Sequence, residues 1–151
     1  MLTEPANVLY RLKRGLSGYV SYLAACEMNE AFTGYGLYEP ILPCPGLENE
    51  VGQRGDVKRI DFDVGGHKLR FAIEVKWART NQIDVKRDYM KLRSYRECVE
   101  GSRAFLCVFG RMSHIEHITL KNGSFSAIGK TVFAEFGVTR FGCRMYELDE
   151  A

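Results

Sequence analysis

Four charged side chains near the middle of the chain have the types and spacing that metal-assisted chemistry uses. Asp61 and Asp63 alternate with apolar residues in RIDFDV, and Glu74 and Lys76 do the same in LRFAIEVKW. Strict alternation predicts two strands, each with one polar and one apolar face. Two carboxylates on neighbouring strands repel each other unless a cation joins them, and Mg²⁺ prefers oxygen ligands. The pattern therefore predicts a Mg²⁺ site beside a lysine.

The loop between the two strands decides how close the carboxylates come. If residues 65–68 form a four-residue loop, Asp61 faces Ala72 and Glu74 is its diagonal neighbour, with Cα atoms roughly 7–8 Å apart. A two-residue Gly-Gly turn instead pairs Asp61 with Arg70 and moves Glu74 further away. We expect the four-residue loop, because it lets both acids hold one ion.

Lys76 follows Glu74 by two residues, so it projects from the same side of the strand. It can reach an attacking water or a phosphate oxygen. A metal ion held by the two acids would polarise a phosphate and make hydroxide available. These residues therefore suit hydrolysis of a phosphodiester bond. Because both lie on the predicted polar face, we expect alanine at Glu74 or Lys76 to leave the fold intact.

The surrounding elements are predicted from periodicity and from helix and turn signals. Residues 19–32 repeat apolar side chains at helical spacing, with Glu27 on the buried stripe and Glu30 at its border. The nearly unbroken apolar run at 103–110 is typical of a buried central strand. The other expected elements are a helix at 5–15, an edge strand at 37–43, a helix at 81–99 capped by Thr80 or Asn81, a helix and loop within 111–137, and a last strand at 143–149. This order predicts an α/β fold, a central mixed sheet flanked by helices, in one domain over 1–151.

The positive charge is unevenly distributed along the chain. Residues 51–96 hold 12 Lys and Arg against 6 Asp and Glu, whereas the whole chain has a net charge of only +2. Such a local excess attracts polyanions. Lys86, Arg87 and Lys91 of the predicted helix are our candidates for contacts with nucleic-acid phosphates, and a plain solvated helix face is the alternative.

Several classes of protein are disfavoured by the composition. No apolar run is long enough to cross a membrane. The N-terminal residues predict no secretion signal, so we expect a cytoplasmic protein. The cysteines are odd in number and widely spaced, which favours separate reduced thiols over a disulfide frame or zinc site. They are Cys26, Cys44, Cys98, Cys107 and Cys143.

Asp61, twelve intervening residues and then Glu74-Val75-Lys76 resemble the motif of the PD-(D/E)XK nuclease superfamily, the restriction-endonuclease-like fold. The resemblance covers residues 19–110 and implies an α-β-β-β-α-β core. It also implies DNA cleavage with Mg²⁺, for which Mn²⁺ can substitute, and does not exclude RNA. The implied metal positions are Asp61, Glu74 and Val75, and Lys76 positions water. Many members add a glutamate from the first helix, a role that Glu27 or Glu30 could fill. The family's proline before the aspartate is Ile60 here.

Other interpretations stay open at this stage. A protein with this fold can lack catalysis and instead bind nucleic acid or a protein. The chain is barely larger than a catalytic core, so specificity could require a homodimer or a partner. Asp63 is expected to pair with Arg70 or Lys68 at the surface. His114 and His117 have helical spacing, but no third metal ligand accompanies them.

Overall fold

The computed structural model describes residues 37–38, 44–51, 57–65 and 70–150. The expected helices at 5–15 and 19–32 lie outside the described residues, and so do Glu27 and Glu30. Among the described residues, no helix combines the length and apolar character needed to cross a bilayer.

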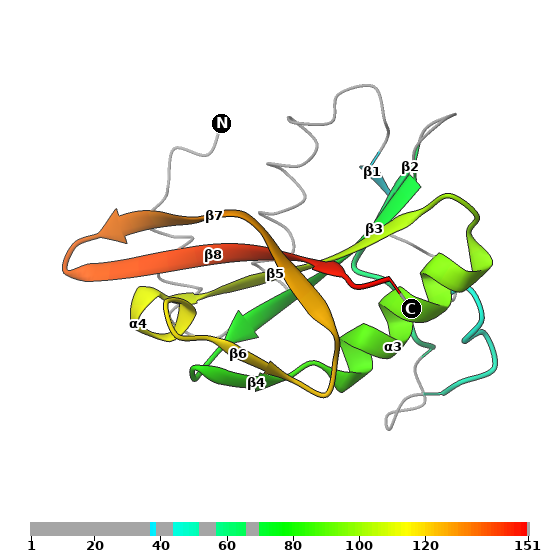
Figure 1. Cartoon of the computed structure of the whole chain (residues 1–151), viewed down its shortest axis with the longest axis horizontal. Coiled ribbons are helices and arrows are strands. Elements are labelled where there is room, and N and C mark those ends of the chain that lie inside the picture. Colours follow the sequence, from blue (N-terminus) through cyan, green and yellow to red (C-terminus); the bar gives the residue numbers. More distant parts are fainter. Residues whose placement is uncertain (1–36, 39–43, 52–56, 66–69, 151) are drawn as a thin grey trace.

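A mixed sheet of six strands forms the centre of the described structure (Figure 1). Its order is β1-β2-β3-β5-β8-β7, and only the β3–β5 pair is parallel. The strands are β1 (Leu37–Tyr38), β2 (Phe62–Gly65), β3 (Arg70–Ala78), β5 (Arg103–Arg111), β7 (Phe125–Phe136) and β8 (Thr139–Leu148). The α/β class and the mixed sheet are thereby confirmed, with the apolar 103–111 run at the centre.

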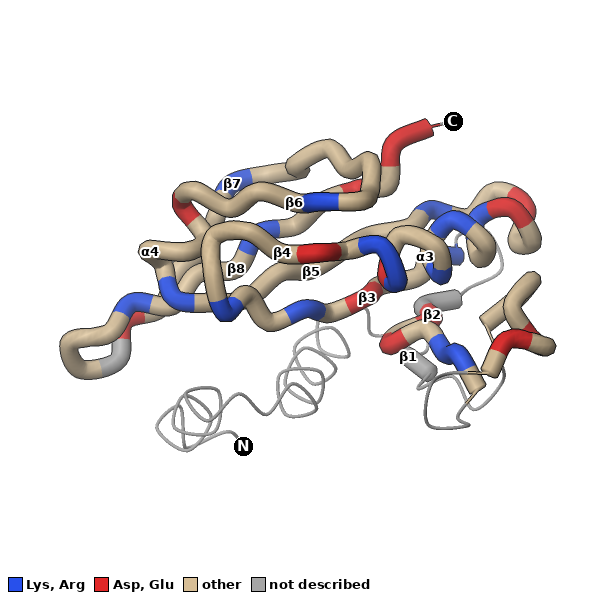
Figure 2. Tube along the Cα trace, turned by 90° about the horizontal axis from the view of Figure 1, so that it is seen from below, with Lys and Arg blue, Asp and Glu red and all other residues tan. Residues whose placement is uncertain are grey.

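Helix α3 (Lys86–Cys98) connects the two parallel strands across one face of the sheet. Two short strands, β4 (Gln82–Asp84) and β6 (Thr119–Lys121), pair with each other in parallel on the same side, near the short helix α4 (Met112–Ile115) (Figures 1 and 2). These elements cover the face of the sheet on which the even-numbered residues of β3 lie.

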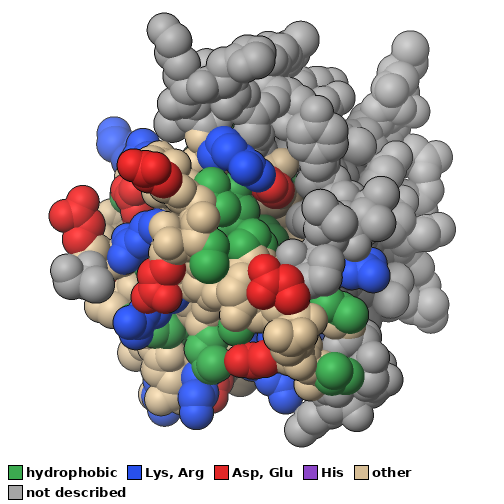
Figure 3. All heavy atoms as spheres, turned by 90° about the vertical axis from the view of Figure 1, so that its right-hand side faces the viewer, with side chains coloured by type: hydrophobic (Ala, Val, Ile, Leu, Met, Phe, Trp, Pro, Cys, Tyr) green, Lys and Arg blue, Asp and Glu red, His purple; other side chains and the backbone are tan. Residues whose placement is uncertain are grey.

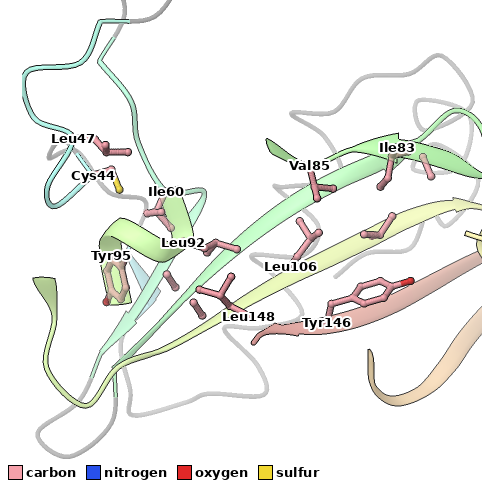
Figure 4. Close-up of a cluster of buried hydrophobic side chains, with 14 of the residues drawn as sticks. Cys44, Leu47, Ile60, Ile83, Val85, Leu92, Tyr95, Leu106, Tyr146 and Leu148 are labelled. Carbon is pink, nitrogen blue, oxygen red and sulfur yellow. The ribbon is translucent and has the colours of Figure 1, made fainter. Parts of the chain in front are cut away.

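The main hydrophobic core lies between that face and α3. Leu92 and Tyr95 of the helix belong to the same cluster as Leu106 and Leu148 of the strands (Figure 4). All four are buried, and burial of apolar side chains contributes roughly 1.5–3 kcal/mol each. A second cluster, centred on Phe71 and Phe105 at an edge-to-face angle of 87°, lies on the opposite face.

The N-terminus of α3 differs from the sequence prediction. We expected a helix from residue 81 with Thr80 or Asn81 as its cap, but residues 82–84 are a strand because β6 pairs with them. Ile83 is buried in the core, and this burial outweighs local helical preference. Asp84 ends β4 and accepts the N–H of Lys86 at 2.8 Å, and Val85 is the N-cap of the helix.

The region 111–137 also differs from the prediction. We expected a helix and a loop, whereas α4 has only four residues and β7 extends over twelve. β7 is an edge strand, and Val132 and Phe133 are 61% and 55% exposed. Its apolar residues therefore lack the regular alternation of a half-buried strand, which hid it from pattern analysis.

Candidate functional site

The β2–β3 hairpin places Asp61 across from Glu74. The observed register, continued by one residue before β2, sets these two acids opposite each other. The expected register is wrong by two residues, because Gly65 stays in the strand and pairs with Arg70. A shift of two keeps every side chain on its face. The acids therefore share a face as predicted, and they are direct neighbours where we expected diagonal ones.

Backbone groups of each strand hold the carboxylate of the other. The N–H of Val75 donates to Asp61 Oδ2 at 2.8 Å, and the N–H of Asp61 donates to Glu74 Oε1 at 3.2 Å. Asp61 Oδ1 has no hydrogen-bond partner in the part of the chain that the structure describes. Within these described residues, Asp61 Oδ1 is therefore open to a further ligand.

Lys91 of α3 supplies the positive charge nearest to these acids. Its ammonium pairs with Glu74 Oε2 and also donates to the carbonyl of Arg59 at 2.9 Å. The Glu74 side chain is only 2% exposed and that of Lys91 17%. We call Asp61, Glu74 and Lys91 the inner cluster. The expectation that Glu74 lies on an open polar face is wrong, because α3 covers it.

The electrostatics of the inner cluster follow from two acids sharing one ammonium. Burial, and then the charge of Asp61, raises the pKa of Glu74 well above its usual value. Burial also raises the pKa of Asp61, against the N–H of Val75, which lowers it. Burial alone would lower the pKa of Lys91, but the neighbouring carboxylates raise it. The cluster therefore has an uncompensated negative charge when both acids are ionised.

Lys76 lies on the same face of β3 as Glu74, as predicted, but its partner is on the helix. Its ammonium pairs with Asp88 of α3 at 2.5 Å, and its side chain is 29% exposed. Asp88, Lys91 and Tyr95 are spaced by three and four residues, which puts them on one side of the helix. That side faces the polar side chains of the hairpin. Lys76 is therefore more accessible than Glu74 and borders the inner cluster.

Asp63 belongs to a separate group, which we call the outer cluster: Asp63, Arg70 and Tyr95. Arg70 donates to one carboxylate oxygen at 2.7 Å and the Tyr95 hydroxyl to the other at 2.5 Å. The prediction that Asp63 pairs with Arg70 is confirmed. The acid has a donor on each oxygen, so the outer cluster has no excess charge to attract a metal ion.

The predicted nucleic-acid contacts of α3 separate into two kinds. Lys86 and Arg87 are exposed at the first turn and make no ion pair within the described ranges. Lys91 instead points into the inner cluster, so its placement on a solvent-facing phosphate surface is wrong. Lys91 was expected at a phosphate-binding surface and not beside the acids, because a charged helix face is normally solvated. Its spacing of three and four from Asp88 and Tyr95 was the available signal.

The remaining candidates contribute less to the described site. Val75 sits between Glu74 and Lys76, and its side chain packs against the second hydrophobic cluster. Within the described ranges, no three His, Cys, Asp or Glu side chains form a group that could hold a metal. This includes His114, whose Nδ1 is buried without a hydrogen-bond partner among the described atoms. Asp61 and Glu74 are therefore two candidate ligands, and Glu27 and Glu30 lie outside the described residues.

The donor set suits a hard divalent cation. Mg²⁺ needs few protein carboxylates, since waters and phosphate oxygens complete its coordination. Asp61 Oδ1 has no hydrogen-bond partner among the described residues, whereas Glu74 Oε2 is engaged by Lys91. Searches for related proteins found no match among family models, curated proteins or solved structures. The interpretation of the site therefore depends on its own geometry.

Proposed function

We propose that this protein is a divalent-metal-dependent nuclease that hydrolyses phosphodiester bonds, with DNA as its substrate. The observation that carries the proposal is the pair of acids formed by the buried Glu74 and the partly buried Asp61, which are fixed by backbone N–H groups and contacted by one ammonium among the described residues. A buried carboxylate without full compensation is costly. Such a pair is typical of sites that bind a cation or move protons.

Each residue has a role that follows from its position. Asp61 and Glu74 would hold the ion, which would polarise the scissile phosphate and provide hydroxide. Lys76, held by Asp88 at the edge of the pair, would donate to the attacking water or to a phosphate oxygen. A fixed cation beside a developing negative charge stabilises the transition state. RNA is the alternative substrate with the same chemistry.

The order of elements supports the finer fold assignment that we propose, a restriction-endonuclease-like core. β1, β2 and β3 form consecutive antiparallel pairs, α3 follows, and β5 returns parallel to β3. This is the β-β-β-α-β part of the expected α-β-β-β-α-β order, with the short β4 inserted. The acids and Lys76 occupy the strand pair that carries the catalytic residues in the family they resemble.

The charges of α3 indicate where nucleic acid would approach. Toward its C-terminus Arg93 pairs with Glu97, and Arg96 donates to the carbonyls of Leu148 and Asp149. On the side of the molecule seen in Figure 3, acidic and basic side chains alternate over the described surface. Lys86 and Arg87, which make no ion pair with any described residue, lie at the other end of the helix, next to β4, and suit contacts with phosphate.

A protein of the same fold that binds nucleic acid or a protein without cleaving anything is the second candidate. The ion pair between Lys91 and Glu74 favours it, because it satisfies the most buried acid without any metal. A site that has lost its catalytic role would keep such a pair for stability.

The decisive experiment incubates the protein with plasmid, linear, single-stranded and branched DNA and with RNA, in Mg²⁺, Mn²⁺ or EDTA. We expect metal-dependent cleavage that Glu74→Gln and Asp61→Asn each reduce by orders of magnitude. Asp63→Asn is the matched control, since it makes the same change two residues away and should keep activity. Binding without cleavage on every substrate, or equal loss in Asp63→Asn, would establish the second candidate instead.

A further inference from the structure

The inner cluster contains a lysine that no role in cleavage requires. Lys91 comes from the helix, not from the strand motif, and it neutralises the acid that the proposed function assigns to the metal. Its ammonium contacts Glu74 Oε2 and the Arg59 carbonyl. A divalent ion bound by the same carboxylate would lie close to that ammonium, where the two positive charges repel.

The position of Lys91 is fixed from several sides. The neighbouring Leu92 is fully buried in the core, which sets the rotation of the helix about its axis. Behind Lys91, the buried thiol of Cys44 donates to its carbonyl at 3.5 Å. The pairing with Glu74 therefore follows from the packing of α3 and is not a chance contact of a surface lysine.

Two other cations that contact the acids and helix at this hairpin are already in ion pairs. Lys76 is taken by Asp88, and Arg70 is taken by Asp63. Within the described residues, Lys91 is thus the cation in contact with Glu74, and Asp61 keeps an open oxygen. Only one of the two acids is neutralised, so the cluster can still attract a divalent ion while Lys91 is in place.

We propose that Lys91 is the resident counter-ion of Glu74 in the metal-free protein, and that a divalent metal ion must displace its ammonium from the carboxylate to bind. The inference rests on the proposed metal site and adds a regulation to it. Lysine suits this exchange because its flexible stem lets the ammonium move while the backbone stays fixed. The Arg59 carbonyl is a second acceptor that can retain the displaced ammonium.

Metal binding without nucleic acid tests the proposal independently of cleavage. We would titrate Mn²⁺ into wild type, Lys91→Met and Lys91→Arg by calorimetry and measure thermal unfolding in EDTA and in Mn²⁺. Lys91→Met removes the competing charge at similar length. We expect it to bind Mn²⁺ at least about tenfold more tightly, the scale on which partners of metal ligands change affinity. Lys91→Arg keeps the charge, so its affinity should stay within a few-fold of wild type.

Stability provides the second readout. In EDTA, Lys91→Met leaves Glu74 buried without its partner and should unfold at a lower temperature than wild type. Mn²⁺ should raise its unfolding temperature more than that of wild type, because tighter binding stabilises the native state more. If Lys91→Met folds only with Mn²⁺, that also supports the proposal. The double variant Glu74→Gln with Lys91→Met removes both charges and should fold in EDTA without the gain in Mn²⁺ affinity.

The outcomes separate this inference from the proposed function. Unchanged or weaker Mn²⁺ binding by a folded Lys91→Met, or failure of the double variant to fold, would overturn the counter-ion role even if wild type cleaves DNA. Tighter Mn²⁺ binding in a protein that cleaves nothing would uphold the counter-ion role and remove the nuclease. No Mn²⁺ binding by wild type or by Lys91→Met would overturn the inference together with the metal site.

Discussion

Two groups of charged residues lie on the same hairpin and beneath the same helix, yet their charges balance differently. In the outer cluster, Asp63 has a donor on each oxygen, from Arg70 and from Tyr95. In the inner cluster, Lys91 is the cation that pairs with Glu74 among the described residues, and its charge also acts to lower the pKa of Asp61. The residue types are similar, and the two aspartates are only two positions apart on one strand.

The difference shows that the ratio of acids to donors marks a site better than burial or residue type does. One acid with two donors is satisfied, so such a group orders the structure and has no reason to bind an ion. Two acids with one ammonium keep a charge that only a proton or a cation can remove. Burial, and then the charge of Asp61, raises the pKa of Glu74. The sequence predicted the pairing of Asp63 with Arg70 or Lys68 but not the donor from Tyr95.

The largest effect should come from Lys76→Ala, which tests whether the border of the inner cluster is catalytic. Cleavage should fall by about 10²–10³-fold, the usual cost of removing one donor to a developing charge. The side chain is partly exposed, so circular dichroism and unfolding temperature should change little. Lys58→Ala is the control, since that lysine pairs with Glu50 at the surface. Full activity in Lys76→Ala would leave the inner cluster without its expected water-positioning group.

The second prediction concerns pH and separates the inner acids from the other carboxylates. An acid whose folded pKa is raised keeps its proton longer when folded, so stability is lost as pH rises from the unfolded pKa to the folded one. For Glu74 and Asp61 this window begins near the ordinary values of 4.5 and 3.8 and extends upward. Each pKa unit corresponds to about 1.4 kcal/mol. An acid whose folded pKa is lowered, such as Glu147, has the opposite effect: its contribution to stability is lost as the pH falls below its ordinary pKa of 4.5.

Denaturant unfolding in EDTA at several pH values measures this effect. The free energy of unfolding should decline from just above pH 4.5 toward neutrality in wild type, and the decline should be smaller in Glu74→Gln. Lys91 does not contribute in this range, because its pKa is raised further above 10.5. Equal pH profiles for the two proteins would mean that Glu74 is compensated as fully as Asp63.

The sequence predicted the strands of this site better than their surroundings. Alternation located β2, β3 and the polar face, and the two-residue error in register did no harm because the side-chain period is also two. The helix that covers this face was predicted to start too early. Residues 82–84 form a strand because they pair with β6, which lies far along the sequence. The burial of Glu74 was missed for the same reason. Alternation in the sequence does not distinguish a polar strand face that is exposed to solvent from one that a helix with matching charges covers.

Lys91 illustrates the limit most clearly. A helix with many Lys and Arg residues predicts a solvated or phosphate-binding face. Lys86 and Arg87 are exposed, as this prediction requires. It fails for Lys91, whose direction is set by the burial of Leu92 and Tyr95 beside it. Only the packing of α3 on β3 decides which charged residue of the helix turns inward.

The third prediction perturbs the outer cluster. Tyr95→Phe removes one donor from Asp63 while the ring keeps its place in the core. A hydrogen bond to a charged group contributes about 1.5–3 kcal/mol, and we expect a loss of stability of that size in chemical unfolding. Mn²⁺ affinity and cleavage should stay near wild type. A marked loss of either would show that the two clusters are coupled through the hairpin, and the contrast between them would no longer hold.

The smallest effect should come from the exposed end of α3, where the helix contributes no charge to either cluster. Lys86→Ala with Arg87→Ala should weaken binding to all DNA sequences alike, because contacts with phosphate do not depend on the bases. Each lost contact should reduce the slope of log affinity against log salt by about one unit.

Arg93→Ala is the matched control on the same helix, because Glu97 already neutralises that arginine. We would measure binding in Ca²⁺ or EDTA across a salt series, so that cleavage does not interfere. An unchanged slope in the double variant would place the phosphate contacts elsewhere. The next candidates from the sequence are the basic residues of the expected helix at 5–15, which are Arg11, Lys13 and Arg14. A change in Mn²⁺ affinity would show that the charge of this helix end reaches the inner cluster.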